Sequence, residues 1–122
     1  MAKIMVVDDS PAVREQVRSD LVGEGYEVVE AGDGRSALEW ILANGPVQLI
    51  ICDLNMPRLD GFGLCEELKR QEKTAQIPVF MLTSQSDNSL KQKGKELGIK
   101  AWIIKPYAVQ ALRSGVKCFA PK

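Results

Sequence analysis

The feature that most constrains the fold is a regular alternation between short β-rich runs and longer helical segments. The β-rich runs are residues 4–7, 26–29, 47–52, 79–83 and 101–104. After each run, apolar residues recur every three or four positions, which is typical of amphipathic helices. Five such repeats with short links predict parallel strands joined by right-handed crossovers. The fold class is therefore α/β, a three-layer sandwich of a five-stranded parallel sheet and five helices.

Local signals predict where the helices begin and end. The first helix is expected to begin after Ser10, with Pro11 at its first position, and to end near Gly23. A glycine inside the fourth helix, Gly94, makes that helix intrinsically weaker by about 1 kcal/mol than alanine would. The other four helices are expected near residues 33–44, 61–68, 87–97 and 109–116.

Composition limits the class of protein. The chain has 122 residues and is 45% hydrophobic, which fits one domain over residues 1–122. Lysine plus arginine and aspartate plus glutamate each number 16, so we expect no overall field that attracts nucleic acid. No apolar run is long enough to cross a membrane, and no signal peptide is visible. We therefore expect a cytoplasmic protein without membrane insertion, and a monomer because no apolar stripe is left over.

Cysteine and histidine usage narrows the possible chemistry. Cys52, Cys65 and Cys118 lack the spacing of metal ligands, and we expect them to be reduced and structural. The chain has no histidine, which removes the commonest general base and the commonest metal ligand. Any chemistry must therefore rest on carboxylates, hydroxyls and amines.

Polar residues follow four of the β-rich runs at the point where each run ends. In an open parallel sheet, ligands gather at the carboxyl ends of the strands. Taken singly, each residue has an ordinary structural role, such as a turn acid or a solvated lysine. Their joint placement favours a site, because independent accidents would not put each one at the end of its own strand. The residues are Asp8 and Asp9, Asp53, Thr83, and Lys105.

The chemistry of this group suits a divalent cation and a phosphoryl group. Clustered carboxylates raise one another's pKa values unless a cation joins them. Mg²⁺ favours one or two carboxylates together with oxygens from water and phosphate. A nearby lysine adds a compact positive charge for phosphoryl oxygens. The set therefore predicts phosphoryl transfer, in which positioning and charge neutralisation supply most of the catalysis.

The same residues, in the same order, resemble the receiver domain of two-component response regulators. The matching motifs are Asp8-Asp9, the segment DLNMP at residues 53–57, Thr83-Ser84 and Lys105-Pro106, and the resemblance covers essentially the whole chain. It implies the flavodoxin-like strand order 2-1-3-4-5. Within the family, residues 82–107 are most similar to the stand-alone CheY-type chemotaxis regulators.

The resemblance implies a role for each site residue. Asp53 is the nucleophile that takes a phosphoryl group from the phosphohistidine of a partner histidine kinase. Lys105 pairs with one phosphoryl oxygen, Thr83 donates its hydroxyl to another, and the Lys105–Pro106 peptide is cis. The protein is then a signalling receiver that catalyses only its own phosphorylation and dephosphorylation. The implied cofactor is Mg²⁺, held by Asp8, Asp9, Asp53 and the backbone carbonyl of Asn55.

The resemblance also implies an output surface formed by the fourth helix and the fifth strand and helix. Thr83 and the aromatic residue three positions before the lysine, Trp102, are the implied switch residues. Tyrosine or phenylalanine is commoner at that position, and a static, partly buried Trp102 is the alternative interpretation. By the same analogy Gln85 flanks the path of the hydrolytic water. The expected target is a component of the flagellar motor switch, with a phosphatase as a further candidate partner.

Three alternatives stay open at this point. The nearest is a receiver of a phosphorelay, or one excised from a larger regulator. A hydrolase of the haloacid dehalogenase type needs a second acid two residues after the nucleophile on the first strand, where this chain has Ser10. A flavin or nucleotide carrier needs a glycine-rich phosphate loop, which Ser10-Pro11 does not supply.

Overall fold

Five parallel strands form a single sheet in the order β2-β1-β3-β4-β5, in a computed structural model that describes residues 2–121. Each neighbouring pair is parallel, so all the strands end at the same edge of the sheet. The expected fold class and strand order are confirmed. The strands are β1 (Lys3–Val7), β2 (Glu27–Ala31), β3 (Leu49–Cys52), β4 (Val79–Thr83) and β5 (Ala101–Ile104).

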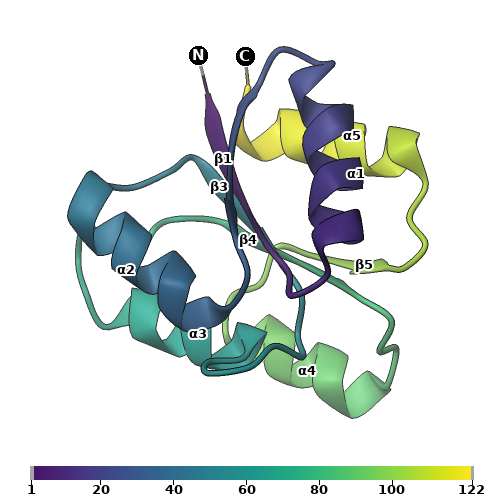
Figure 1. Cartoon of the computed structure of the whole chain (residues 1–122). Coiled ribbons are helices and arrows are strands. Elements are labelled where there is room, and N and C mark those ends of the chain that lie inside the picture. Colours follow the sequence, from purple (N-terminus) through teal and green to yellow (C-terminus); the bar gives the residue numbers. More distant parts are fainter. Residues whose placement is uncertain (1, 122) are drawn as a thin grey trace.

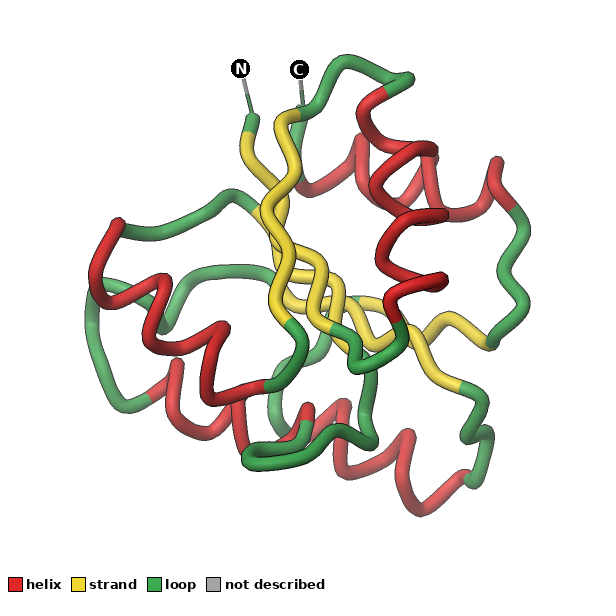
Figure 2. The backbone as a smooth tube through the Cα atoms, viewed as in Figure 1, coloured by secondary structure: helices red, strands yellow, loops and turns green. Residues whose placement is uncertain are grey.

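Helices cover both faces of this sheet. Helices α1 and α5 lie side by side on one face of the sheet, and α2, α3 and α4 cover the opposite face (Figure 1). Every crossover between strands therefore contains one helix, as Figure 2 shows by the alternation of yellow and red segments. The helices are α1 (Pro11–Val22), α2 (Gly34–Asn44), α3 (Gly61–Lys69), α4 (Asn88–Glu96) and α5 (Val109–Phe119).

The core forms two apolar layers, one on each side of the sheet. Strands β1, β3 and β4 are buried along almost their whole length, because helices cover both of their faces. One layer packs residues such as Val17 and Leu21 of α1 against Leu112 of α5, and the other packs α2 and α3. A third, smaller cluster joins Met81 of β4 to Leu54, just after β3, and to Phe62 of α3. This small cluster connects the site edge of the sheet to α4.

Three strands differ from the sequence prediction at one or both ends. Strand β1 begins at Lys3 rather than Ile4, and β2 continues to Ala31 rather than ending at Val29. Strand β2 begins at Glu27 rather than Tyr26, and the Tyr26 ring is buried in the core just before it. Strand β3 begins at Leu49 rather than residue 47, and just before it the Gln48 side chain accepts the Lys3 backbone N–H at 2.6 Å while the Gln48 N–H donates to the Lys3 carbonyl at 2.9 Å. Strands β4 and β5 have the bounds that the sequence predicts.

The helix starts agree with the capping signals in the sequence. The Ser10 hydroxyl accepts the Val13 N–H at 3.3 Å, and Pro11 occupies the first position of α1. Asp33 and Asp60 cap α2 and α3 in the same way, each through one carboxylate oxygen. Helices α4 and α5 have no side-chain cap. The two uncapped helices belong to the C-terminal third of the chain.

Cys118 does not behave as predicted. Cys52 and Cys65 are buried, but Cys118 lies exposed on the outer side of α5 and adds nothing to the core. The three thiols are free. In the region 2–121, no helix has both the length and the apolar character that a membrane crossing requires.

Candidate functional site

Three carboxylates meet where β1 and β3 end. One oxygen from each of Asp8, Asp9 and Asp53 lies within 4.8 Å of the others. Asp8 and Asp53 are buried, with 2% and 9% of their surface exposed, whereas Asp9 faces solvent. The structure thus brings together the acids that the sequence selected, and it leaves one side of the cluster open to a ligand.

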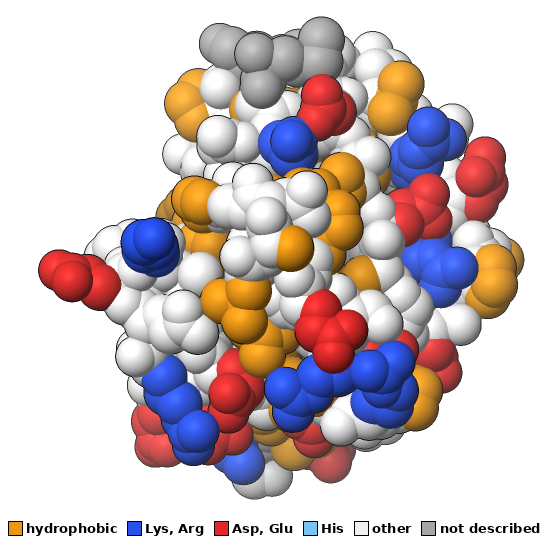
Figure 3. Space-filling model, turned by 60° about the vertical axis from the view of Figure 1, so that its left-hand side comes forward, with side chains coloured by type: hydrophobic (Ala, Val, Ile, Leu, Met, Phe, Trp, Pro, Cys, Tyr) orange, Lys and Arg blue, Asp and Glu red, His pale blue; other side chains and the backbone are white. Residues whose placement is uncertain are grey.

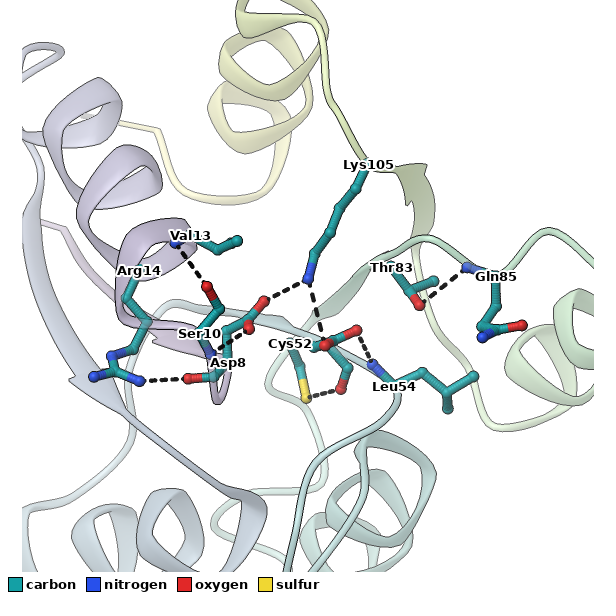
Figure 4. A network of polar contacts seen from close by, with 10 residues as sticks. Asp8, Ser10, Val13, Arg14, Cys52, Leu54, Thr83, Gln85 and Lys105 are labelled. Atoms are coloured by element: carbon teal, nitrogen blue, oxygen red, sulfur yellow. Dashed lines mark hydrogen bonds and ion pairs between the residues drawn. The ribbon is translucent and has the colours of Figure 1, made fainter.

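Lys105 reaches this cluster from the end of β5. Its Nζ atom lies 2.8 Å from Asp8 Oδ2 and 3.4 Å from Asp53 Oδ2. Figure 4 shows the side chain extending from its strand into the space between the loops that follow β1 and β3. The Lys105–Pro106 peptide is cis, as the family resemblance implied. A single cation therefore faces two buried carboxylates.

Burial and charge shift the titration of this group. Burial raises the pKa of Asp53 above its ordinary value, the positive charge of Lys105 offsets part of that rise, and Asp8 adds to it. Burial alone lowers the pKa of Lys105, but the hydrogen bond to Asp8 and the charge of Asp53 raise it overall. The lysine is therefore firmly cationic, and the cluster carries an excess of negative charge whenever its acids are ionised.

The donor set of the cluster fits a hard divalent cation. It consists of carboxylate oxygens at close range, one of them solvent-exposed, with a single ammonium to offset their charge. Oxygen ligands are what Mg²⁺ prefers, so these acids fit the ion that the family resemblance implied. Asn55 lies exposed in the loop after β3, two residues beyond Asp53. Its role as a carbonyl ligand stays a prediction.

Thr83 occupies the end of β4 on the other side of the cluster. It is buried, and its Oγ1 atom accepts the backbone N–H of Gln85 at 3.2 Å (Figure 4). The hydroxyl acts only as an acceptor in this contact, so its own proton is available for another oxygen.

Trp102 is linked to the same loop. Its indole Nε1–H donates to the backbone carbonyl of Gln85 at 2.8 Å. The ring is half-buried, and its centroid lies 6.2 Å from that of Phe62. A β-carbon added at Gly94 of α4 would lie 3.0 Å from the indole, so the ring lies directly against the α4 backbone. Gln85 therefore contacts both predicted switch residues, a link that no sequence signal reveals.

Sequence reasoning also missed Arg14. Its Nη1 donates to the backbone carbonyl of Asp8 at 2.6 Å, and its Nε pairs with Glu30 at 3.1 Å. The Ser10 N–H in turn donates to Asp8 Oδ1 at 2.9 Å. These bonds hold the loop after β1 in place around the buried acid. The only sequence signal for Arg14 is its position one turn into the helix that Ser10 caps.

The surface near the α2 and α3 side mixes both signs of charge. Lysine and arginine side chains lie next to acidic ones in the face shown in Figure 3, and apolar side chains separate the groups. This mixture agrees with the formal net charge of zero.

The chain is similar to known proteins over nearly its full length. The family model for the response regulator receiver domain matches residues 4–117. A probable transcriptional regulator, ycf27 of Porphyridium aerugineum, is 37% identical over 115 residues, which are 94% of this chain and 46% of that protein. The DNA-binding dual master transcriptional regulator RpaA of Synechocystis is 36% identical over 117 residues, 96% of this chain and 48% of the relative. The chain thus spans about half the length of these curated relatives.

Solved structures show the same similarity. The chemotaxis protein CheY4 of Vibrio cholerae superimposes with a TM-score of 0.90 at 35% identity, over 98% of both chains. A putative response regulator from Chloroflexus aurantiacus has a TM-score of 0.90 at 36% identity, over 97% of this chain and 96% of that one.

Proposed function

This chain belongs to the response regulator receiver family, and we propose that it is a signalling switch whose Asp53 accepts a phosphoryl group from a partner histidine kinase. A receiver is a signalling module rather than a conventional enzyme, and we propose that residues 1–122 act as a single receiver unit. One observation carries the proposal. Asp53 lies buried at the end of β3, between the carboxylate of Asp8 and the ammonium of Lys105.

The proposed transfer makes one bond and breaks one. A carboxylate oxygen of Asp53 attacks the phosphorus atom, and the nitrogen–phosphorus bond of the phosphohistidine breaks with its electron pair left on the imidazole. Lys105 offsets the charge of the incoming phosphoryl oxygens, because its ammonium already contacts Asp53. The Thr83 hydroxyl donates its free proton to another of these oxygens.

Asp8, Asp9 and Asp53 would hold the Mg²⁺ ion, with the Asn55 carbonyl as a fourth protein ligand. When bound, the ion neutralises charge that develops on the phosphoryl oxygens. Arg14 and Ser10 keep the Asp8 segment in place through the bonds to its carbonyl and carboxylate. The protein's own contribution is therefore a set of acids whose positions are established before the ion and the phosphoryl donor arrive.

The proposed output runs through Gln85. When Thr83 turns toward the phosphoryl group, the Gln85 N–H loses its acceptor, and the same residue's carbonyl holds the Trp102 indole. Movement of this loop then changes how Trp102 lies against α4. The exposed lysines of α4 and its surroundings make this surface complementary to an acidic partner segment; they are Lys91, Lys93, Lys95 and Lys100.

The comparisons leave two finer expectations from the sequence unsupported. A flagellar motor target is not supported, because the similar curated proteins are named as transcriptional regulators. The expected absence of nucleic acid from the system is also unsupported, since one relative is a DNA-binding regulator. We therefore propose the alternative named above, a receiver of the kind found in a larger regulator, whose output acts on a transcription-control module.

Intact mass spectrometry tests the central proposal. Incubation with acetyl phosphate should add a single phosphoryl group, and only when Mg²⁺ is present. Asp53→Asn should abolish the addition, whereas the matched control Asp87→Asn, an exposed acid without a side-chain capping bond, should leave it unchanged. Labelling that survives Asp53→Asn, or its absence from the folded natural protein, would overturn the proposed function.

A further inference from the structure

The loop between β3 and α3 contains an unusual backbone conformation at Arg58. Among residues 2–121, Arg58 is the one non-glycine residue with a positive φ, at 69°. This left-handed region is unfavourable for a residue with a β-carbon. Such a conformation persists only where the surrounding structure holds it in place.

The Arg58 guanidinium lies on the first two turns of α2. Its Nη1 atom is 3.5 Å from Asp33 Oδ2 and also 3.5 Å from the Ser36 hydroxyl. Its Nη2 atom is 4.0 Å from Glu39 Oε2. One arginine thus contacts the N-cap residue, the first turn and the second turn of a neighbouring helix.

The backbone next to Arg58 is docked on the same turn of α2. The Gly34 N–H donates to the Leu59 carbonyl at 3.1 Å. A β-carbon at Gly34 would lie 2.3 Å from that oxygen, so only glycine permits this close approach. Arg58 and Leu59 therefore anchor one end of the loop to α2, by a side chain and a carbonyl respectively.

The other end of the loop is anchored beside the phosphoryl-acceptor residue. The Gly61 N–H donates to the Leu54 carbonyl at 2.9 Å. A β-carbon at Gly61 would lie 2.6 Å from the Asp53 carbonyl oxygen, which again requires glycine. Asn55 lies between these two anchors. The segment that contains Asn55 is therefore held at both of its ends.

We propose that Arg58 is a positioning residue for the metal site, because its contacts with α2 anchor the loop of residues 54–60, which contains the proposed ligand Asn55. The inference rests on the proposed function, since the loop matters to a metal only if Asn55 is a ligand. Arg58 itself is not a ligand, and it acts through the loop that it anchors.

The direction in which Mg²⁺ affinity changes on removal of the Arg58 side chain distinguishes a positioning role from a purely electrostatic one. Removal of a positive charge near an acidic site should, by the field alone, strengthen the binding of a divalent cation. Loss of an anchoring contact should weaken it, because the ligand set is less well ordered. The two explanations thus predict opposite changes in Mg²⁺ affinity for Arg58→Ala.

The first arm of the test uses the metal-free protein. Amide hydrogen exchange at Gly34 reports directly on its bond to the Leu59 carbonyl. Exchange should accelerate about threefold or more in Arg58→Ala and Arg58→Gly, and stay within about twofold of the natural rate in Arg58→Lys. Arg70→Ala is the matched control, because it removes the same charge from an exposed residue whose one salt bridge within residues 2–121 is with its neighbour Glu67. Unchanged exchange in Arg58→Ala would overturn the anchoring role.

The second arm measures Mg²⁺ affinity by calorimetric titration of the same variants. Arg58→Ala and Arg58→Gly should bind Mg²⁺ about threefold to tenfold more weakly. This loss is smaller than is usual for residues that support metal ligands, because the Arg58 side chain is half-exposed. Arg58→Lys should restore most of the affinity, and Arg70→Ala should bind as well as the natural protein or slightly better.

Two outcomes contradict the positioning role while leaving the proposed function intact. One is tighter Mg²⁺ binding in Arg58→Ala, which would show a purely electrostatic effect. The other is natural affinity in Arg58→Gly, which relieves the backbone conformation but removes the side chain. Failure of the natural protein to bind Mg²⁺ would instead overturn the proposed function, and the positioning role with it.

Discussion

The surroundings of β1 and α1 differ sharply from those of α4 and β5 in how firmly they are packed. Four consecutive residues of β1 are buried, and α1 has a capping serine, a proline at its first position and two fully buried residues. In α4 the only buried residue is Gly94, the helix has no side-chain cap, and β5 is an edge strand without a buried residue. The acids Asp8 and Asp9 thus follow the firmly packed β1, whereas the predicted output surface lies on the loosely packed α4 and β5.

This difference has a physical rationale. A site that holds several carboxylates close together, despite their mutual repulsion, needs rigid helices and strands to support it. A surface that responds to a new hydrogen bond needs elements that open or shift at little cost in free energy. Strand β5 links the two regions. Trp102 in this strand lies against α4, and Lys105, just after the strand, reaches the acid cluster.

The largest expected effect is a difference in stability between matched leucine substitutions. Leu21→Ala in α1 should lower the free energy of unfolding by about 3 kcal/mol, because its side chain is fully buried. Leu90→Ala in α4 should lower it by only about 1 kcal/mol, because Leu90 is partly exposed. Urea unfolding followed by circular dichroism measures both. Equal losses would show that α4 is packed as firmly as α1.

In the absence of metal, the buried Asp53 carboxylate should lower the free energy of unfolding. Because burial raises the pKa of Asp53 in the folded state, this carboxyl holds its proton to a higher pH in the folded protein than in the unfolded one. The contribution of Asp53 to stability should therefore fall as the pH rises from below the ordinary aspartate pKa through the raised one. Asp53→Asn lacks this loss and should be more stable at neutral pH by about 1 kcal/mol.

Urea unfolding over a pH series in a metal-chelating buffer provides the measurement for Asp53→Asn. The stability difference between variant and natural protein should grow with pH and then level off. Asp87→Asn, just before the loosely packed α4, is the control and should show no such trend. A difference that shrinks as the pH rises would contradict the raised pKa.

The smallest expected effect on stability concerns the contact between Gly94 of α4 and the Trp102 ring. Gly94→Ala improves the helix propensity of α4 by about 1 kcal/mol, but its β-carbon would lie 3.0 Å from the Trp102 ring. We expect these effects to offset each other to within about 0.5 kcal/mol, while the indole moves away from α4. The fluorescence of Trp102, measured in a Trp40→Phe background, should shift to longer wavelength. An unchanged spectrum would mean that the ring has room to accept a methyl group.

Much of the site could be predicted because its members follow a local rule. Asp8, Asp53 and Lys105 each come directly after a run of apolar residues, and parallel strands bring such positions to one edge. The anchoring arginines could not be predicted in the same way. Nothing in the sequence around Arg14 and Arg58 distinguishes them from ordinary solvated arginines. Their partners Glu30 and Asp33 are 16 and 25 positions away in the chain.

The sequence by itself determined the alternation of strands and helices, the capped starts of α1, α2 and α3, and the polar residues at the strand ends. These follow from periodicity and from hydrogen bonds between residues close in the chain. Only the tertiary structure decided the left-handed conformation of Arg58, the docking of Leu59 on Gly34, and the bond from Trp102 to Gln85. Each of these joins elements that are separated in sequence, so its energy depends on packing that no local pattern encodes.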